Sequence, residues 1–144
     1  MDFMTSLDIS ASALRATKTR INVASMNLAN IQTTRTREGG PYRKRVATIA
    51  SQSLDNPVSP KMESEFMREL QGVRVTGIVR ENVFTRKYDP SHPDADTEGY
   101  VTLPDINPIE EMANLMNLQR LYEANTTAIE VAKSMYMKAL EIGS

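Results

Sequence analysis

The chain of 144 residues contains no cysteine, no tryptophan and only one histidine. Without cysteine there is no disulfide, no thiolate metal ligand and no cysteine nucleophile. A single histidine gives little support for a histidine-based metal site or for general acid–base catalysis. The sequence also lacks a glycine-rich phosphate loop, a serine-triad motif and a paired-histidine metal motif. These absences argue against an enzyme, and we expect no cofactor.

Long hydrophobic runs are missing as well. No stretch approaches the roughly 18 apolar residues that a membrane-spanning helix needs. The first residues, MDFMTSLDIS, carry acidic side chains and no basic region ahead of an apolar run, so they do not resemble a secretory signal. We therefore expect no direct membrane span. A protein of this kind that leaves the cytoplasm needs an export route without a cleaved signal peptide.

The strongest pattern present is a heptad repeat at each end of the chain. The front repeat consists of Leu7, Leu14, Ile21 and Leu28. The rear repeat consists of Leu115, Tyr122, Ile129 and Tyr136, joined by Leu118 and Ala132. A seven-residue repeat places a nearly straight apolar seam along a helix, which a second helix must cover.

These patterns predict a mainly α fold with a small β insert. We expect an N-terminal heptad helix within residues 1–34, a small β-rich insert at 35–106 and a C-terminal heptad helix within 107–144. The terminal helices should form one domain, paired as an antiparallel-type coiled coil. The rear helix would reach about 52 Å at 1.5 Å per residue. Because a compact chain of this size is narrower than that, the molecule should be elongated.

Alternating apolar residues predict short strands within the insert. One is expected at 42–50 and a last one at 100–103. Segments 73–79 and 83–88 flank Glu81-Asn82, which suggests that they pair as a hairpin.

The rear helix is apolar on more than one side. A second stripe runs beside its heptad seam, through Leu121, Ala128, Met135 and Ile142. In one interpretation the front helix covers one side and the insert covers the other. A small insert cannot cover about 52 Å of helix, however, and exposed apolar surface of this extent usually marks an interface.

Charge is distributed unevenly along the chain. Residues 1–45 have a net charge of +5 and the remainder has a net charge of −6. A dipolar subunit of this kind can meet copies or relatives with opposite charges in register. The alternative is a solvated surface on which the charges are segregated by chance.

The segment 92–105 offers the main alternative function, a calcium- or metal-responsive binding module. It begins with His92 and then follows the acidic ladder of a calcium loop, with Asp94, Asp96, Glu98, Gly99 and Asp105 at the expected spacing. Pro93 stands where an incoming helix is needed, and residues 101–104 resemble a strand. A polar surface turn is therefore the favoured interpretation.

A basic run at 35–45 could contact phosphates, but no known nucleic-acid-binding module surrounds it. We expect no nucleic-acid partner. A solvated or subunit-facing strand is the preferred interpretation of this run.

Several segments carry a more specific likeness. Asn27-Leu28-Ala29-Asn30, followed by Thr33, resembles the signature that closes the N-terminal helix of bacterial flagellar rod and hook proteins. Matching residues spread from Glu111 to Met135 are similar to their C-terminal helix, and the stretch 88–96 resembles the proximal rod members of that family.

This resemblance implies a structural subunit of the flagellar proximal rod, which polymerises helically into the drive shaft that transmits torque. It implies a place in the basal body, as part of the periplasmic rod, and export through the flagellar type III apparatus. The implied partners are copies of the chain itself, other flagellar rod proteins, the inner-membrane ring and the export apparatus. The heptad seams and the family signature place the expected assembly interface at Leu7, Leu14, Ile21, Leu28, Asn27, Asn30, Leu115, Leu118, Tyr122, Asn125, Ile129, Ala132, Met135 and Tyr136.

Overall fold

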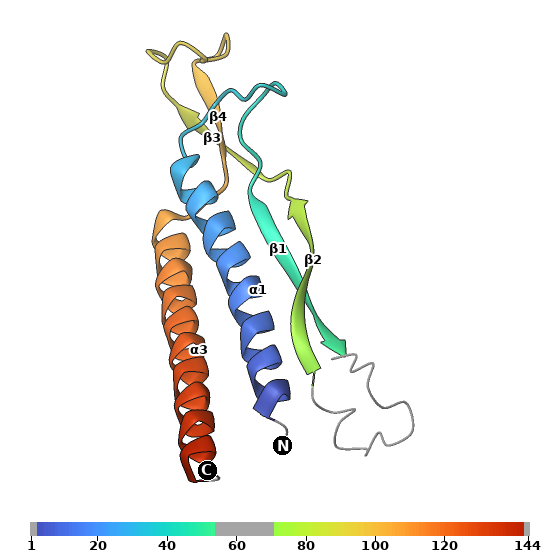
Figure 1. Ribbon diagram of the computed structural model, residues 1–144. Coiled ribbons are helices and arrows are strands. Elements are labelled where there is room, and N and C mark those ends of the chain that lie inside the picture. The colour runs from blue at the N-terminus through green and yellow to red at the C-terminus, as the bar shows by residue number, and fades with distance from the viewer. Residues whose placement is uncertain (1–2, 54–70, 143–144) are drawn as a thin grey trace.

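The computed structural model describes residues 3–53 and 71–142. In chain order its elements are α1 (Phe3–Ala29), β1 (Arg45–Ser53), β2 (Gln71–Arg80), β3 (Phe84–Tyr88), β4 (Tyr100–Pro104) and α3 (Pro108–Ile142). The two helices follow the long axis of the molecule (Figure 1). The β1–β2 sheet lies beside α1, and the β3–β4 sheet lies beyond the end of the helices at which α3 begins (Figure 1).

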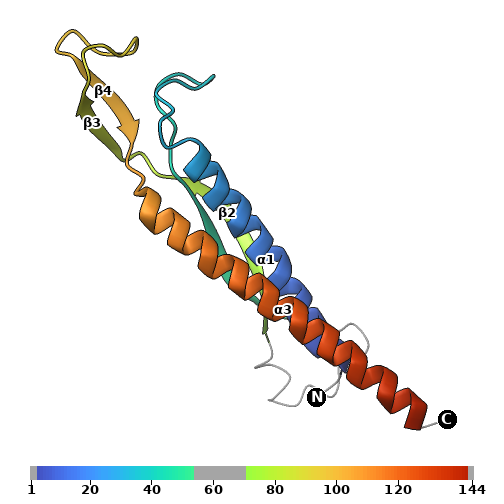
Figure 2. The same cartoon turned by 90° about the vertical axis from the view of Figure 1, so that its left-hand side faces the viewer.

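The expectation of a mainly α fold, held together as a long antiparallel coiled coil, is wrong. The 27-residue α1 and the 35-residue α3 are accompanied by two separate two-stranded sheets. α1 lies between α3 on one side and the β1–β2 sheet on the other (Figures 1 and 2). A coiled coil buries one narrow seam, whereas α1 is covered from two directions. The architecture is therefore a mixed α and β one, with α1 at its centre.

Small side chains explain why α1 can take two neighbours. Its buried positions are Ser12, Ala16, Thr17, Val23, Ala24 and Asn27. Short side chains let a helix backbone approach its neighbours closely, so a sheet and a helix can both reach it. The leucines and isoleucine of the predicted front seam are only partly buried, because the buried stripe is centred on these smaller residues.

α3 runs antiparallel to α1 and begins with a well-formed cap. Asn107 Oδ1 accepts a hydrogen bond from Ile109 N at 3.0 Å, and Pro108 occupies the first helical position. At the other end α3 loses its cover, since every residue from Lys133 to Ile142 is exposed. In the part of the chain that the structure describes, neither helix is long and apolar enough to cross a membrane.

The predicted hairpin between 73–79 and 83–88 is wrong. β2 pairs antiparallel with β1, and β3 pairs antiparallel with β4. Glu81 N donates to Lys44 O at 2.8 Å, so the chain stays bonded to the first sheet just beyond β2 before it crosses to the second. α1 contacts both β1 and β2, so this pairing is supported by a segment that is distant in the chain and not by the local turn.

The loop from β3 to β4 closes on a glycine that cannot be replaced freely. Gly99 has a φ of 84°, in the left-handed region that favours glycine. A Cβ at this position would lie 3.0 Å from Tyr88 Cε2 and 3.2 Å from Pro90 Cβ. Backbone conformation and space both select glycine at this turn.

Candidate functional site

The Asn27 side chain, 2% exposed, is the buried polar centre of the subunit. Its Nδ2 donates to Arg45 O at 2.9 Å and to Glu111 Oε1 at 3.4 Å. Its Oδ1 accepts from Arg45 N at 2.9 Å and from the Tyr42 hydroxyl at 3.1 Å. A side-chain amide has two donors and two acceptor lone pairs, and all of them are used here. Asn27 therefore joins α1, the segment that leads into β1 and the start of α3.

Glu111 supplies a buried charge at the same point. The residue is 7% exposed, and Lys44 Nζ lies 3.6 Å from its Oε1. Asn27 and Lys44 both meet Oε1, whereas Oε2 is buried with no hydrogen-bond partner in the described part of the chain, so the buried charge is compensated only in part. Burial raises the pKa of the Tyr42 phenol, and the negative charge of Glu111 adds to this rise while the charge of Arg45 opposes it. Tyr42 therefore stays protonated and keeps donating to Asn27.

Asn30 closes α1 and orders the turn that follows. Its Nδ2 donates to Met26 O at 2.8 Å, and its Oδ1 accepts from the Thr33 hydroxyl at 3.2 Å. Tyr42 N in turn donates to Thr33 O at 3.0 Å. The two asparagines of the family signature thus fix the corner at which the chain leaves α1 and enters the first sheet.

The residues predicted to form the assembly interface are divided between the interior and the surface. Asn27 and Leu118 are buried, at 2% and 3% exposed. Partly buried are Leu7, Leu14, Ile21, Leu28, Asn30, Leu115, Asn125, Ile129 and Ala132. Exposed are Tyr122, Met135 and Tyr136. The buried residues pack inside the molecule, the partly buried ones keep part of their surface accessible, and the last group is exposed.

A further exposed apolar surface, absent from the sequence-based prediction, lies at the start of α3. Ile109, Met112 and Met116 are exposed, with Ile109 reaching 76%. Their spacing of three and then four residues places them on one face of the helix. That spacing is visible in the sequence, although the heptad seam beside it is the more prominent pattern.

The segment 92–105 does not have the geometry of a calcium loop. The Thr34 hydroxyl donates to Asp94 at 2.7 Å, and Arg86 Nη2 binds Asp96 at 2.6 Å. The two carboxylates are thus turned toward separate protein partners, and β4 occupies the second half of the segment. Across residues 3–53 and 71–142 there is no group of three or more His, Asp or Glu side chains that could hold a metal ion.

Asp96 instead acts as the organising residue of a surface turn. Its Oδ1 accepts from Glu98 N at 3.0 Å and from Tyr100 N at 2.8 Å. The hydrogen bond from Tyr100 N lowers the pKa of Asp96, and the Arg86 guanidinium lowers it further. Desolvation acts in the opposite direction, but the net shift of the pKa is downward. Arg86 also lies over the Tyr100 ring, 4.8 Å from its centroid. The favoured interpretation of this segment, a polar turn, agrees with these contacts.

Comparison with known proteins identifies the family. Residues 97–142 match the family model described as the C-terminal part of the flagellar basal body rod FlgEFG proteins. The chain is 42% identical to the flagellar basal-body rod protein FlgC of Bacillus subtilis, with 96% of each chain covered. It is 39% identical to FlgC of Borreliella burgdorferi, covering 99% of this chain and 98% of that protein. It is 31% identical to FlgC of Salmonella typhimurium, with 99% of each covered. With this similarity along nearly its whole length, the chain belongs to the FlgC family of flagellar basal-body rod proteins.

Proposed function

We propose that this chain is a structural subunit of the proximal rod in the flagellar basal body, where it assembles with other basal-body components and transmits torque without catalysing a reaction. The observation that carries the proposal is the amount of apolar surface left uncovered on α3. Met135 is 67% exposed and Ile142 is 88% exposed. A lone soluble protein rarely leaves an apolar helix end of this kind in water.

Covering this surface would provide the free energy of assembly. Full burial of one methionine, leucine or isoleucine side chain stabilises by about 1.5–3 kcal/mol. The exposed large apolar residues of α3 are Ile109, Met112, Met116, Leu121, Tyr122, Val131, Met135, Tyr136, Met137, Leu140 and Ile142. A few of these contacts per neighbour are enough to offset the cost of association.

We propose that the exposed apolar residues of α3 pack against copies of this chain and against other flagellar rod proteins. Torque would pass through side chains interlocked along the helices, which resist sliding because each knob sits in a hole of the facing helix. Contacts with the inner-membrane ring and the export apparatus, and export by the flagellar type III route, belong to the same proposal. Family resemblance alone supports these further partners and this route.

The proposal is tested by placing a charge on the exposed face of α3. The full chain carrying Met135→Glu is expressed in a flagellated strain that lacks its own copy, and Met135→Leu serves as the control of similar volume. Because Met135 is 67% exposed, the charged variant should fold normally by circular dichroism. It should nevertheless be depleted at least about tenfold from purified basal bodies, since a buried unpaired charge is strongly unfavourable. Normal swimming by cells with Met135→Glu would contradict the proposal.

A charge placed between the helices should act differently. Leu14→Glu on α1 and Ile129→Asp on α3 replace partly buried residues, so each should lower the stability of the free subunit as well as block assembly and motility. A melting curve of the purified chain separates the two classes of variant. Unchanged melting together with normal swimming in Leu14→Glu or Ile129→Asp would contradict the interlocked helices proposed here.

A further inference from the structure

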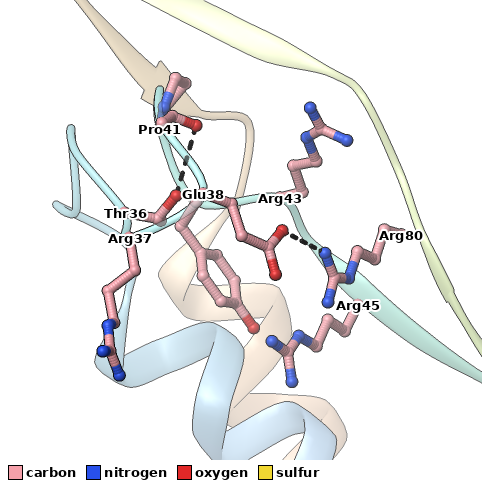
Figure 3. Close-up of a pocket in the computed structure, with 9 residues that line it drawn as sticks. Thr36, Arg37, Glu38, Pro41, Arg43, Arg45 and Arg80 are labelled. Carbon is pink, nitrogen blue, oxygen red and sulfur yellow. Dashed lines mark hydrogen bonds and ion pairs between the residues drawn. The ribbon is translucent and has the colours of Figure 1, made fainter.

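At one end of the β1–β2 sheet, three arginines surround a single carboxylate (Figure 3). Arg80 Nη1 forms a hydrogen bond and ion pair with Glu38 Oε2. In the same view Arg45 lies below the carboxylate, and Arg43 lies above it with its guanidinium directed outward (Figure 3). The hydrogen bond and charge of Arg80 lower the pKa of Glu38, and the charges of Arg43 and Arg45 lower it further. The site thus favours a negative charge at this position.

The sheet register makes the clustering costly without an anion. Arg45 and Arg80 are directly opposite each other in the β1–β2 ladder. Like charges at opposed positions of an antiparallel pair destabilise it. Glu38 supplies one negative charge against three positive ones, so it neutralises the arginines only in part.

The guanidinium groups of the three arginines differ in how many interactions they already make within the molecule. Arg45 lies over the Tyr42 ring, 5.8 Å from its centroid, and its Nη1 is 3.6 Å from Met26 Sδ. Arg43 is exposed and has no carboxylate within ion-pair distance among the residues that the structure describes. The guanidinium group presents a planar set of donors that matches a carboxylate. Arg43 is therefore the arginine best placed to take a further acidic group.

The turn that carries Glu38 is held in place before any partner arrives. Thr36 N donates to Gly40 O at 2.8 Å, and Gly39 N donates to Thr36 O at 3.0 Å. Gly39 and Gly40 have φ values of 90° and 71°, which suit glycine. The residues around the cluster enclose a shallow hollow of about 130 Å³, which suits the end of an acidic side chain.

We propose that Arg43, Arg45 and Arg80 bind a second carboxylate, which is supplied by α3 of a second copy of this chain in the assembled rod. This inference rests on the proposed function as a rod subunit and adds the chemistry and identity of one contact. The incoming group joins Glu38 and brings the charge of the cluster closer to neutrality.

Two acidic residues on α3 fit the role of ligand. Glu123 and Glu130 are exposed and seven positions apart, hence on one face of the helix. Neither has an ion-pair partner in the described part of the chain. Arg45 and Arg80 belong to the β1–β2 sheet, and the greater part of α3 lies on the other side of α1 from this sheet (Figure 1). A contact from the sheet side of one copy to α3 of the next joins two different surfaces, and such a contact builds an open helical assembly when the rotation between copies does not close a ring.

Charge reversal with rescue tests the contact. The full chain carrying Arg43→Glu should be depleted about tenfold from purified basal bodies, which is typical of a lost interfacial charge pair. The pair Glu123→Arg with Glu130→Arg should have a similar effect, and all three changes together should restore assembly. Arg15→Glu makes the same change of charge on an exposed site of α1 and should leave assembly intact.

The outcomes separate this inference from the proposed function. If the wild-type chain is absent from basal bodies, the proposed function fails. If the wild-type chain is present and Arg43→Glu is equally abundant, only the arginine site is overturned. Depletion without rescue overturns the assignment of the carboxylate to a second copy and points to another rod protein.

A second readout leaves the three arginines and both proposed ligands in place. Because the chain contains no cysteine, a specific cysteine pair can be introduced, with Glu38→Cys in one copy and Thr127→Cys, an exposed position on α3 between Glu123 and Glu130, in another. We expect a cross-linked dimer in basal bodies after treatment with a short bismaleimide. No dimer, with both single-cysteine chains present in the rods, would overturn the inference.

Discussion

Asn27 on α1 and Glu111 on α3 are in hydrogen-bond contact, with 3.4 Å between Nδ2 and Oε1, although 84 positions separate them in the chain. The Asn27 side-chain amide also fixes the backbone of Arg45, since its Nδ2 donates to Arg45 O and its Oδ1 accepts from Arg45 N. One side chain therefore sets the relative position of two helices and a sheet. A neighbour that packs against this end of the subunit meets a surface whose geometry is fixed in advance.

Replacement of Asn27 should strongly destabilise the subunit. Asn27→Leu leaves Arg45 N and the Tyr42 hydroxyl without their buried acceptor, and each unsatisfied group costs about 1–3 kcal/mol. We expect the free energy of unfolding to fall by about 3 kcal/mol in urea denaturation. The control Asn22→Leu changes an exposed residue of the same helix and should have little effect. Equal stability of the two variants would show that the network contributes nothing.

The loop between β3 and β4 should loosen in acid. Since the pKa of Asp96 is lowered from 3.8 in the folded protein, its contribution is complete above that value and is lost as the pH falls through the lowered pKa. The amide resonance of Tyr100, which donates to Asp96 at 2.8 Å, should report the change in an NMR titration. Asp96→Asn keeps the acceptor and should remove this transition. A Tyr100 shift that is the same in both proteins would assign the transition to another group.

Hydrogen exchange should reveal a gradient along α3 in the free subunit. Glu111 and Leu118 are its buried residues, whereas Lys133 to Ile142 are all exposed. A helix without packing gains little stability of its own. Amides around residue 118 should therefore exchange slowly and those beyond 133 quickly, as measured by mass spectrometry. Uniform protection of α3 in the monomer would contradict this expectation.

Calcium should have no effect on the segment 92–105. Asp94 and Asp96 are held by Thr34 and Arg86, so a cation would have to break contacts that already satisfy them. We expect no binding heat with calcium, manganese or zinc in calorimetry at micromolar protein. Micromolar binding that disappears in Asp94→Ala would revive the metal-responsive alternative.

The heptad repeats predicted a helix at each end of the chain, where α1 and α3 lie. Asn107 and Pro108 mark the start of α3, because a capping side chain and a proline at the first position act through neighbouring backbone atoms. Strands were also expected near β1, β2, β3 and β4. Their pairing was not predicted correctly, since it depends on which strands α1 can cover, and that information is not local.

The candidate site shows the same limit. The family signature marked Asn27 and Asn30 as expected interface residues. Nothing in the sequence indicates that the Asn27 side chain contacts Glu111. The basic run at 35–45 was visible, whereas its counterpart Arg80 lies far along the chain and is brought to it by the β1–β2 register. Contacts of this kind follow from the packing of distant elements.

The uncovered end of α3 has a consequence for the free chain in the cell. From Lys133 to Ile142 the helix is exposed, with Ile142 at 88%. The tip of α3 in an unassembled subunit therefore presents apolar side chains that can associate with other apolar surfaces. Subunits that accumulate before a growing rod is ready to receive them would cluster through these tips. We therefore expect the cell to keep the pool of unassembled subunits small, or to shield the tip with a chaperone until the moment of incorporation.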